Sequence, residues 1–152
     1  MTEKQKQMAI LLQDLALAFI INSTATILGG GFESAGAYWS GMGMAFCINY
    51  IAGLVIPVES IGRGAAEKLK LRDGGFPHRL VRTAVVNAIF VTIISLSIAM
   101  IQGGLGPDLL FAWLSTYPAL HIVGLIASLL LEAPCACLAQ TLIPSSKPSK
   151  GA

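Results

Sequence analysis

Four long runs of apolar residues dominate the chain, and most polar residues lie between them. The runs cover residues 9–28, 35–58, 83–101 and 109–131, and the last has an apolar extension to residue 143. A helix needs about 20 apolar residues to cross the roughly 30 Å hydrocarbon core of a bilayer. Each run is close to this length or longer, so the pattern predicts four membrane-spanning helices.

The length and pattern of the runs favour helices over barrel strands. Strands of a membrane barrel are about half as long and alternate between apolar and polar residues, and neither feature occurs here. A helix also satisfies its own backbone hydrogen-bonding groups in hydrocarbon. Glycine-rich breaks follow the first run at residues 29–31 and the third run at residues 103–107. The predicted fold class is an all-α bundle of four transmembrane helices, arranged as two helical hairpins.

These runs divide the chain into four parts. They are a first transmembrane hairpin (residues 1–60), a cytoplasmic basic loop (61–82), a second transmembrane hairpin (83–143) and a disordered C-terminal tail (144–152). The first run is longer than the apolar core of a usual signal peptide and is followed by no clear A-x-A cleavage site. We therefore expect it to remain in the protein as a helix.

The positive charges predict how the helices are oriented. Lysine and arginine occur before the first run (Lys4, Lys6), between the second and third runs (Arg63, Lys68, Lys70, Arg72, Arg79, Arg82) and after the fourth run (Lys147, Lys150). The other two connections carry Glu33 and Asp108 instead. Because Lys and Arg are retained on the cytoplasmic side, we expect a multi-pass protein of the cell membrane with both termini in the cytoplasm. The central basic residues act as a topology signal or, alternatively, bind anionic lipid headgroups.

Composition supports a lipid environment and excludes several classes of ligand. The chain has 152 residues, of which 55% are hydrophobic and 12% charged, whereas a soluble domain has about 25% charged residues. The net charge is only +2, and the basic residues form no stripe with interleaved aromatics, which argues against nucleic acid. Cys47, Cys135 and Cys137 have neither the paired spacing of disulfides nor a nearby histidine for a metal site. We expect no metal and no cofactor.

The two hairpins share a motif at an offset of 74 residues. Ser23-x-Ala25-x-Ile27-x-Gly29-Gly30 matches Ser97-x-Ala99-x-Ile101-x-Gly103-Gly104, and Trp39 then aligns with Trp113. Both halves begin and end on the same side, so they would be parallel repeats related by an axis along the membrane normal. Each tryptophan follows the start of a run at the outer boundary. We interpret Trp39 and Trp113 as interfacial anchors.

The second half of this motif resembles a known family. It reads Gly103-Gly104-Leu105-Gly106-Pro107, then Phe111-Ala112-Trp113-Leu114 and Tyr117-Pro118. This pattern resembles the small bacterial membrane proteins grouped as domain of unknown function 2798, closely over one hairpin and loosely over the other, and that resemblance implies no activity. The layout is also similar to that of the proton-coupled antimicrobial-compound efflux family. That family's Arg, His and Glu cluster in the first helix is missing from residues 9–28, so the similarity is one of layout alone.

Polar residues inside the runs are costly in a membrane and are therefore candidate functional residues. Asp14, in the first run, is either a proton or cation site or a carboxylate that reaches the cytoplasmic water layer. His121 shares a helix face with Tyr117 in the fourth run, and it either relays protons or bonds to a neighbouring helix. Asn49, like Asn87, Thr92 and Ser95, suits an interhelical hydrogen bond. We take Asp14, Asn49, Tyr117 and His121 as the candidate intramembrane polar site.

Two functions fit these observations. The sequence has no nucleophile elbow, phosphate-binding loop or cofactor fingerprint, so we do not expect an enzyme. The polar residues favour a small proton-coupled transporter or efflux protein, and a homo-oligomer would enlarge the pathway that four helices enclose. The many small residues suit helix contacts and favour the alternative, a non-catalytic membrane scaffold or accessory protein. The small-molecule or ion substrate is not specified by the sequence.

Overall fold

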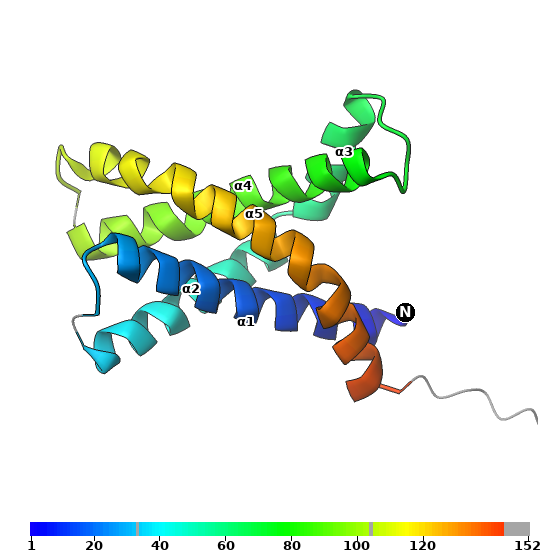
Figure 1. Cartoon of the computed structure of the whole chain (residues 1–152), viewed down its shortest axis with the longest axis horizontal. Coiled ribbons are helices and arrows are strands. Elements are labelled where there is room, and N and C mark those ends of the chain that lie inside the picture. Colours follow the sequence, from blue (N-terminus) through cyan, green and yellow to red (C-terminus); the bar gives the residue numbers. More distant parts are fainter. Residues whose placement is uncertain (33, 104, 145–152) are drawn as a thin grey trace, which may run out of the picture.

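The computed structural model describes residues 1–32, 34–103 and 105–144, and all of its regular structure there is helical (Figure 1). The helices are α1 (Glu3–Leu28), α2 (Ala35–Val55), α3 (Val58–Lys68), α4 (Phe76–Gly103) and α5 (Leu109–Leu142). The all-α class is therefore confirmed. Glu33, Gly104 and the tail residues 145–152, with Lys147 and Lys150, lie outside the described residues.

Three of these helices, α1, α4 and α5, are each long and apolar enough to cross a membrane. A fourth such segment consists of α2 and α3 together, but the two helices are bent by 67° relative to each other. The predicted second span, residues 35–58, therefore ends early, at Val55. Pro57 explains the break, because proline disfavours a helical conformation in the residue before it, and Ile56 is extended with φ −101° and ψ 125°.

The segment predicted as a basic loop, residues 61–82, is largely helical. It contains most of α3 and the beginning of α4, and only residues 69–75 connect the two helices. α3 buries Val58, Gly62 and Ala66, which recur every four residues, and packs against α4. A search for spans of about 20 apolar residues misses such a helix, because a short amphipathic helix needs only a narrow apolar stripe.

The helices pack as two antiparallel hairpins laid against each other (Figure 1). α1 packs against α2 and α4 against α5, while α1 also contacts α5 and α2 contacts α4. Ala18, Ala45 and Ile94 join α1, α2 and α4, and a second cluster, Ile21, Val91 and Leu120, joins α1, α4 and α5. We call the end with the α1–α2 and α4–α5 connections the hairpin end. The opposite end, with the N-terminus, α3 and the end of α5, is the α3 end.

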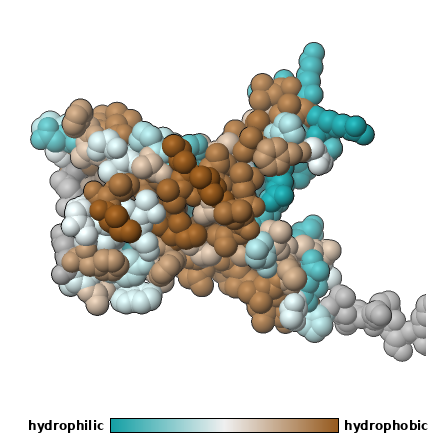
Figure 2. Space-filling model, in the orientation of Figure 1, coloured by the Kyte–Doolittle hydropathy of each residue, from teal (hydrophilic) through white to brown (hydrophobic). Residues whose placement is uncertain are grey.

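The surface of the bundle is broadly apolar. Figure 2 shows hydrophobic side chains across the middle of the molecule and hydrophilic ones gathered mainly towards its ends. Large side chains such as Phe19, Leu54 and Leu130 are about half or more exposed. Exposed apolar surface of this extent is unusual for a monomer in water and fits helices that face lipid.

α3 depends on a glycine for its packing against α4. A Cβ atom at Gly62 would lie 2.8 Å from Val86 Cγ2 and 2.9 Å from the Arg82 carbonyl oxygen, whereas one at Gly64 would meet nothing within 4 Å. We predict that Gly62→Ala detaches α3 from α4 at a cost of at least about 1 kcal/mol. Hydrogen exchange should then be faster in α3 of this variant, while Gly64→Ala should slow it or leave it unchanged. Equal protection in both variants would contradict the packing.

Candidate functional site

Polar side chains face one another along the α4–α5 interface, and we call this set the α4–α5 polar row. From the hairpin end, its contacts are Trp113 Nε1 to Ser95 Oγ (2.8 Å), Tyr117 OH to Thr92 Oγ1 (3.0 Å), Asn87 Nδ2 to His121 Nδ1 (3.1 Å), and Arg79 and Arg82 to Glu132 (2.7 and 2.9 Å). Thr83 and Ser128 are buried polar residues in the turns before the last contact. The row thus continues along most of both helices.

On α5 the aromatic members of the row recur every four residues and so share one face of the helix. The ring centroids of Trp113 and Tyr117 lie 4.9 Å apart, and those of Tyr117 and His121 lie 5.9 Å apart with the rings inclined by only 13°. From Trp113 to Glu132 the helix rises by about 28 Å at 1.5 Å per residue. The row is therefore nearly as long as the roughly 30 Å hydrocarbon core is thick.

The hydrogen bonds from Asn87 select one tautomer of the neutral His121 ring. Asn87 Nδ2 donates to the His121 carbonyl oxygen at 3.0 Å, and because a carbonyl only accepts, this amide end is the nitrogen. The same nitrogen faces His121 Nδ1, which must therefore accept. The imidazole in this arrangement is neutral, with its proton on Nε2. Protonation at Nδ1 would break the contact with Asn87.

Gly124 lets Asn87 approach α5 this closely. A Cβ atom at Gly124 would lie 2.6 Å from Asn87 Oδ1, 3.1 Å from Ile21 Cδ1 and 3.2 Å from Val91 Cγ2. Asn87 is itself buried, with 5% of its surface exposed. The position next to the Asn87–His121 contact therefore accommodates only glycine without a shift of its neighbours.

At the α3 end the polar row becomes charged. Glu132 accepts from Arg79 Nε through Oε2 and from Arg82 Nη2 through Oε1. Arg79 Nη2 also donates to the Leu129 carbonyl oxygen at 3.0 Å. Glu59 of α3 lies 3.9 Å from Arg82 Nη1. One carboxylate thus joins two arginines of α4 to α5, and Arg82 extends the network to α3.

Asp14 and Asn49 come together at a different interface, between α1 and α2. Both are buried, with 7% and 1% of their surfaces exposed, and the Asn49 side chain is the polar neighbour of the Asp14 carboxyl group. Within the described residues Asn49 Oδ1 has no hydrogen-bond partner. The alternative of a carboxylate that reaches water and pairs with a lysine or arginine does not fit, because neighbouring helices cover Asp14.

The structure thus divides the predicted polar site into two pairs, Tyr117 with His121 and Asp14 with Asn49. The two predicted anchors also differ: Trp39 is 59% exposed, whereas Trp113 is half-buried and bonds to Ser95. Sequence reasoning missed the row as a whole, although the four-residue spacing from Trp113 to His121 was visible. The partners on α4 could not be assigned without knowing how the helices align.

A cavity of about 520 Å³ lies at the hairpin end of the polar row, and we call it the hairpin-end cavity. Side chains of α1, α4 and α5 line it together with Gly106 and Asp108 of the α4–α5 connection, and Ser95 and Trp113 form part of its wall. Its volume is within the usual range of small-molecule sites, about 300–1,000 Å³. The polar row therefore begins at a space large enough for a ligand.

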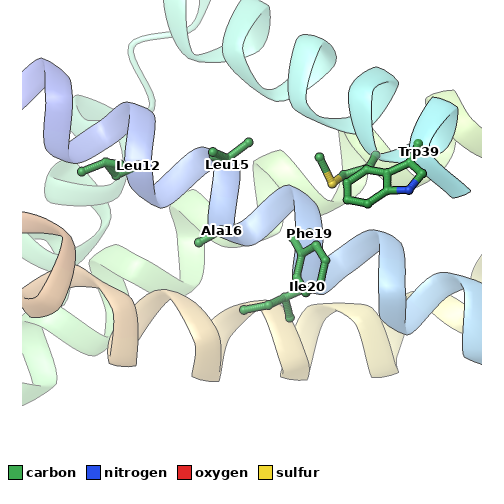
Figure 3. A pocket seen from close by; sticks show the side chains of 7 residues that line it. Leu12, Leu15, Ala16, Phe19, Ile20 and Trp39 are labelled. Atoms are coloured by element: carbon green, nitrogen blue, oxygen red, sulfur yellow. The ribbon is translucent and has the colours of Figure 1, made fainter.

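A second hollow, of about 380 Å³, lies on the outer surface of α1 and α2 (Figure 3). Its lining residues are Leu12, Leu15, Ala16, Phe19, Ile20, Trp39 and Met42. Leu15, Phe19 and Trp39 are exposed on the same surface. The Trp39 indole N–H is the one strong hydrogen-bonding group among these lining side chains, so the groove adds nothing to the polar site.

Neither metal geometry nor similarity to known proteins assigns the site. Among the described residues, no group of three or more His, Cys, Asp or Glu side chains is arranged to hold a metal ion. The chain matches no protein family, no curated protein and no solved structure with which it was compared. The function must therefore be argued from the geometry of the polar row and its cavity.

Proposed function

We propose that the protein is a small proton-coupled transporter and that the α4–α5 polar row is its proton route. The observation that carries the proposal is the succession of polar contacts along the α4–α5 interface, from the hairpin-end cavity to Glu132. Buried polar groups in membrane helices are costly and mark ion and proton pathways. A row of this length exceeds what is needed to hold two helices together.

His121 is the central proton-carrying group of this route. Imidazole can bind and release a proton. The Tyr117 ring stacks on that of His121, and the Tyr117 hydroxyl donates to Thr92 Oγ1, whose own proton is donated to the Ala88 carbonyl oxygen. When His121 gains a proton at Nδ1, this nitrogen can no longer accept from Asn87, and only the bond from Asn87 Nδ2 to the His121 carbonyl oxygen remains. Proton binding therefore removes one contact between α4 and α5, two of the helices that line the hairpin-end cavity. Asp14, beside Asn49 at the α1–α2 interface, is a second buried group that can carry a proton.

The charges support an orientation in which the α3 end faces the cytoplasm. Lys4, Arg63 and the other described lysines and arginines lie in α3, at the beginnings of α1 and α4, or in the connection between α3 and α4. The positive-inside rule then places both termini in the cytoplasm, with α2 as the fourth span and α3 at the inner boundary. The hairpin-end cavity opens to the outside in this orientation.

The helix boundaries support an origin by duplication into two parallel repeats. α2 starts at residue 35 and α5 at residue 109, at the 74-residue offset of the sequence motif, and α1 and α4 correspond at the same offset within a residue or two. The polar sites, however, are not duplicated. Gly43 and Cys47 occupy the positions equivalent to Tyr117 and His121, and Ala88 occupies the position equivalent to Asp14. Each hairpin therefore has a specialised polar pair.

Proton uptake by liposomes containing the purified protein tests the proposal. A potassium diffusion potential drives the protons, and an enclosed pH-sensitive dye reports them. We expect His121→Phe to lower the flux on the order of 100-fold, because phenylalanine keeps the ring but carries no proton. Asp14→Asn and Tyr117→Phe should also lower it, and the surface variant Trp39→Phe should not. Wild-type flux in both His121→Phe and Asp14→Asn would exclude these residues from the mechanism.

The scaffold function is less well supported. Some of the small residues that suggested it make close contacts inside the chain, because Cβ atoms at Gly41, Gly62 and Gly124 would each lie within 2.8 Å of a neighbouring atom. These three glycines are therefore already used to pack the bundle and do not require a partner. If the purified wild-type protein moved no protons at all, the scaffold function would become the better proposal.

A further inference from the structure

The hairpin-end cavity has walls suited to an apolar body. Ile21, Ile98, Leu109 and Leu120 line it from three helices, with Ala25, Ala99 and Ala112 between them. Removing apolar surface from water is favourable and does not depend on direction. An aromatic or branched aliphatic group would therefore be held here without specific hydrogen bonds.

Among the described residues that line the cavity there is one negative charge and no positive charge. Asp108 is the single charged residue among those that line it. It lies immediately before α5 but makes no capping hydrogen bond, and it forms no ion pair within the part of the chain that the structure describes. Its carboxylate is thus available to a ligand, and a cation would be attracted while an anion would be repelled.

The aromatic wall of the cavity favours the same charge. Trp113 lines it, and the bond from Trp113 Nε1 to Ser95 Oγ fixes the indole in place. The face of an indole attracts cations more strongly than that of other aromatic side chains. A fixed tryptophan and a carboxylate that line the same cavity form a suitable site for an ammonium group.

The hydroxyl groups of the cavity have no proton left to donate to a ligand. Ser95 Oγ donates to the Val91 carbonyl oxygen and accepts from Trp113. Thr116 Oγ1 donates to the Trp113 carbonyl oxygen at 3.1 Å. Acceptor groups of a ligand, such as carbonyl or carboxylate oxygens, would find no hydroxyl donor there, which costs about 1–3 kcal/mol for each buried group. A quaternary ammonium group brings no such groups.

We infer that the hairpin-end cavity binds monovalent organic cations with an apolar body, and that these are the transported substrates. The second part rests on the proposed proton-coupled transport. A cation beside Asp108 lies next to the first contact of the polar row, Ser95 with Trp113. A proton on the row and a cation in the cavity repel each other, so the arrival of one promotes the release of the other.

Binding to the purified protein tests the site without any transport. Trp39 and Trp113 are the two tryptophans of the chain, so in Trp39→Phe protein the fluorescence reports Trp113 alone. Benzyltrimethylammonium, benzyl alcohol and phenylacetate share a benzyl group and differ in charge. We expect a saturable fluorescence change with the ammonium compound, at least roughly tenfold weaker binding of the other two, and a similar loss in Asp108→Asn protein. Glu67→Gln should bind as the parent does.

The outcomes separate this inference from the transport function. Equal binding of the three compounds, or unchanged binding in Asp108→Asn protein, overturns the cation site even if His121-dependent proton flux is observed. Charge-selective binding without proton flux, both in the absence and in the presence of benzyltrimethylammonium, supports the site and overturns the transport function. Release of benzyltrimethylammonium from liposomes in exchange for protons would support both.

Discussion

Gly124→Ala is expected to destabilise the protein by about 3 kcal/mol. The added methyl would lie 2.6 Å from Asn87 Oδ1 and close to Ile21 and Val91. Overpacking of a close-packed interior costs about 1–3 kcal/mol. Asn87 would have to turn away and lose its two contacts with His121, each worth about 1 kcal/mol. Equilibrium unfolding in mixed micelles of dodecylmaltoside and sodium dodecyl sulfate would measure the loss.

Two further variants show whether the contact with Asn87 is the cause. Gly43→Ala is the matched control, because a Cβ atom there would meet nothing within 4 Å, and it should stabilise helix α2 or leave it unchanged. In an Asn87→Ala background the side chain that obstructs the methyl is gone. In this background Gly124→Ala should lower the free energy of unfolding by less than it does in the wild-type protein. A cost that is the same in both backgrounds would locate the strain elsewhere.

Glu132→Gln is expected to lower the free energy of unfolding by about 1–2 kcal/mol. Glu132 is the carboxylate that pairs with both Arg79 and Arg82, and its loss leaves two guanidinium groups without that partner. The side chains of Arg79 and Glu132 are 42% and 36% exposed and that of Arg82 is 28% exposed. Solvent screening therefore keeps the cost below that of a fully buried pair.

The same unfolding assay measures this loss of stability. Its dependence on salt and on a second substitution shows whether it comes from the ion pairs of Glu132. Raised salt should reduce the difference in the free energy of unfolding between wild-type and Glu132→Gln protein, because mobile ions screen exposed charges. Glu67→Gln, on the exposed face of α3, should leave the free energy of unfolding unchanged. In Arg79→Gln protein the effect of Glu132→Gln should be smaller than in the wild type. Full additivity of the two substitutions would mean that the pair contributes nothing to stability.

Local features of the sequence were sufficient to predict the three long helices α1, α4 and α5. The run of residues 109–131 with its apolar extension is the helix α5, and the runs 9–28 and 83–101 lie inside α1 and α4. Apolar length and glycine or proline breaks are properties of neighbouring residues, so they can be read along the chain. α3 was missed because eleven residues with a narrow apolar stripe do not stand out in a basic segment.

Identifying candidate residues also needed only the sequence, since polar side chains in apolar runs stand out one by one. Their partners could not be predicted from the sequence, because the α4–α5 contacts join residues that are far apart in the chain. Asn87 and His121 are separated by 34 residues, and Arg79 and Glu132 by 53. The spacing along each helix defines a face, but it does not say which face meets which neighbour or at what height.

Tertiary packing decided those pairings. The close approach at Gly124 sets Asn87 against His121, and the packing of α1 on α2 covers Asp14 with Asn49 beside it. The sequence determined by itself that the chain consists of apolar helices with isolated polar groups. Only the packed structure joined those groups into a row, because the alignment of two helices depends on how the side chains of both surfaces fit together.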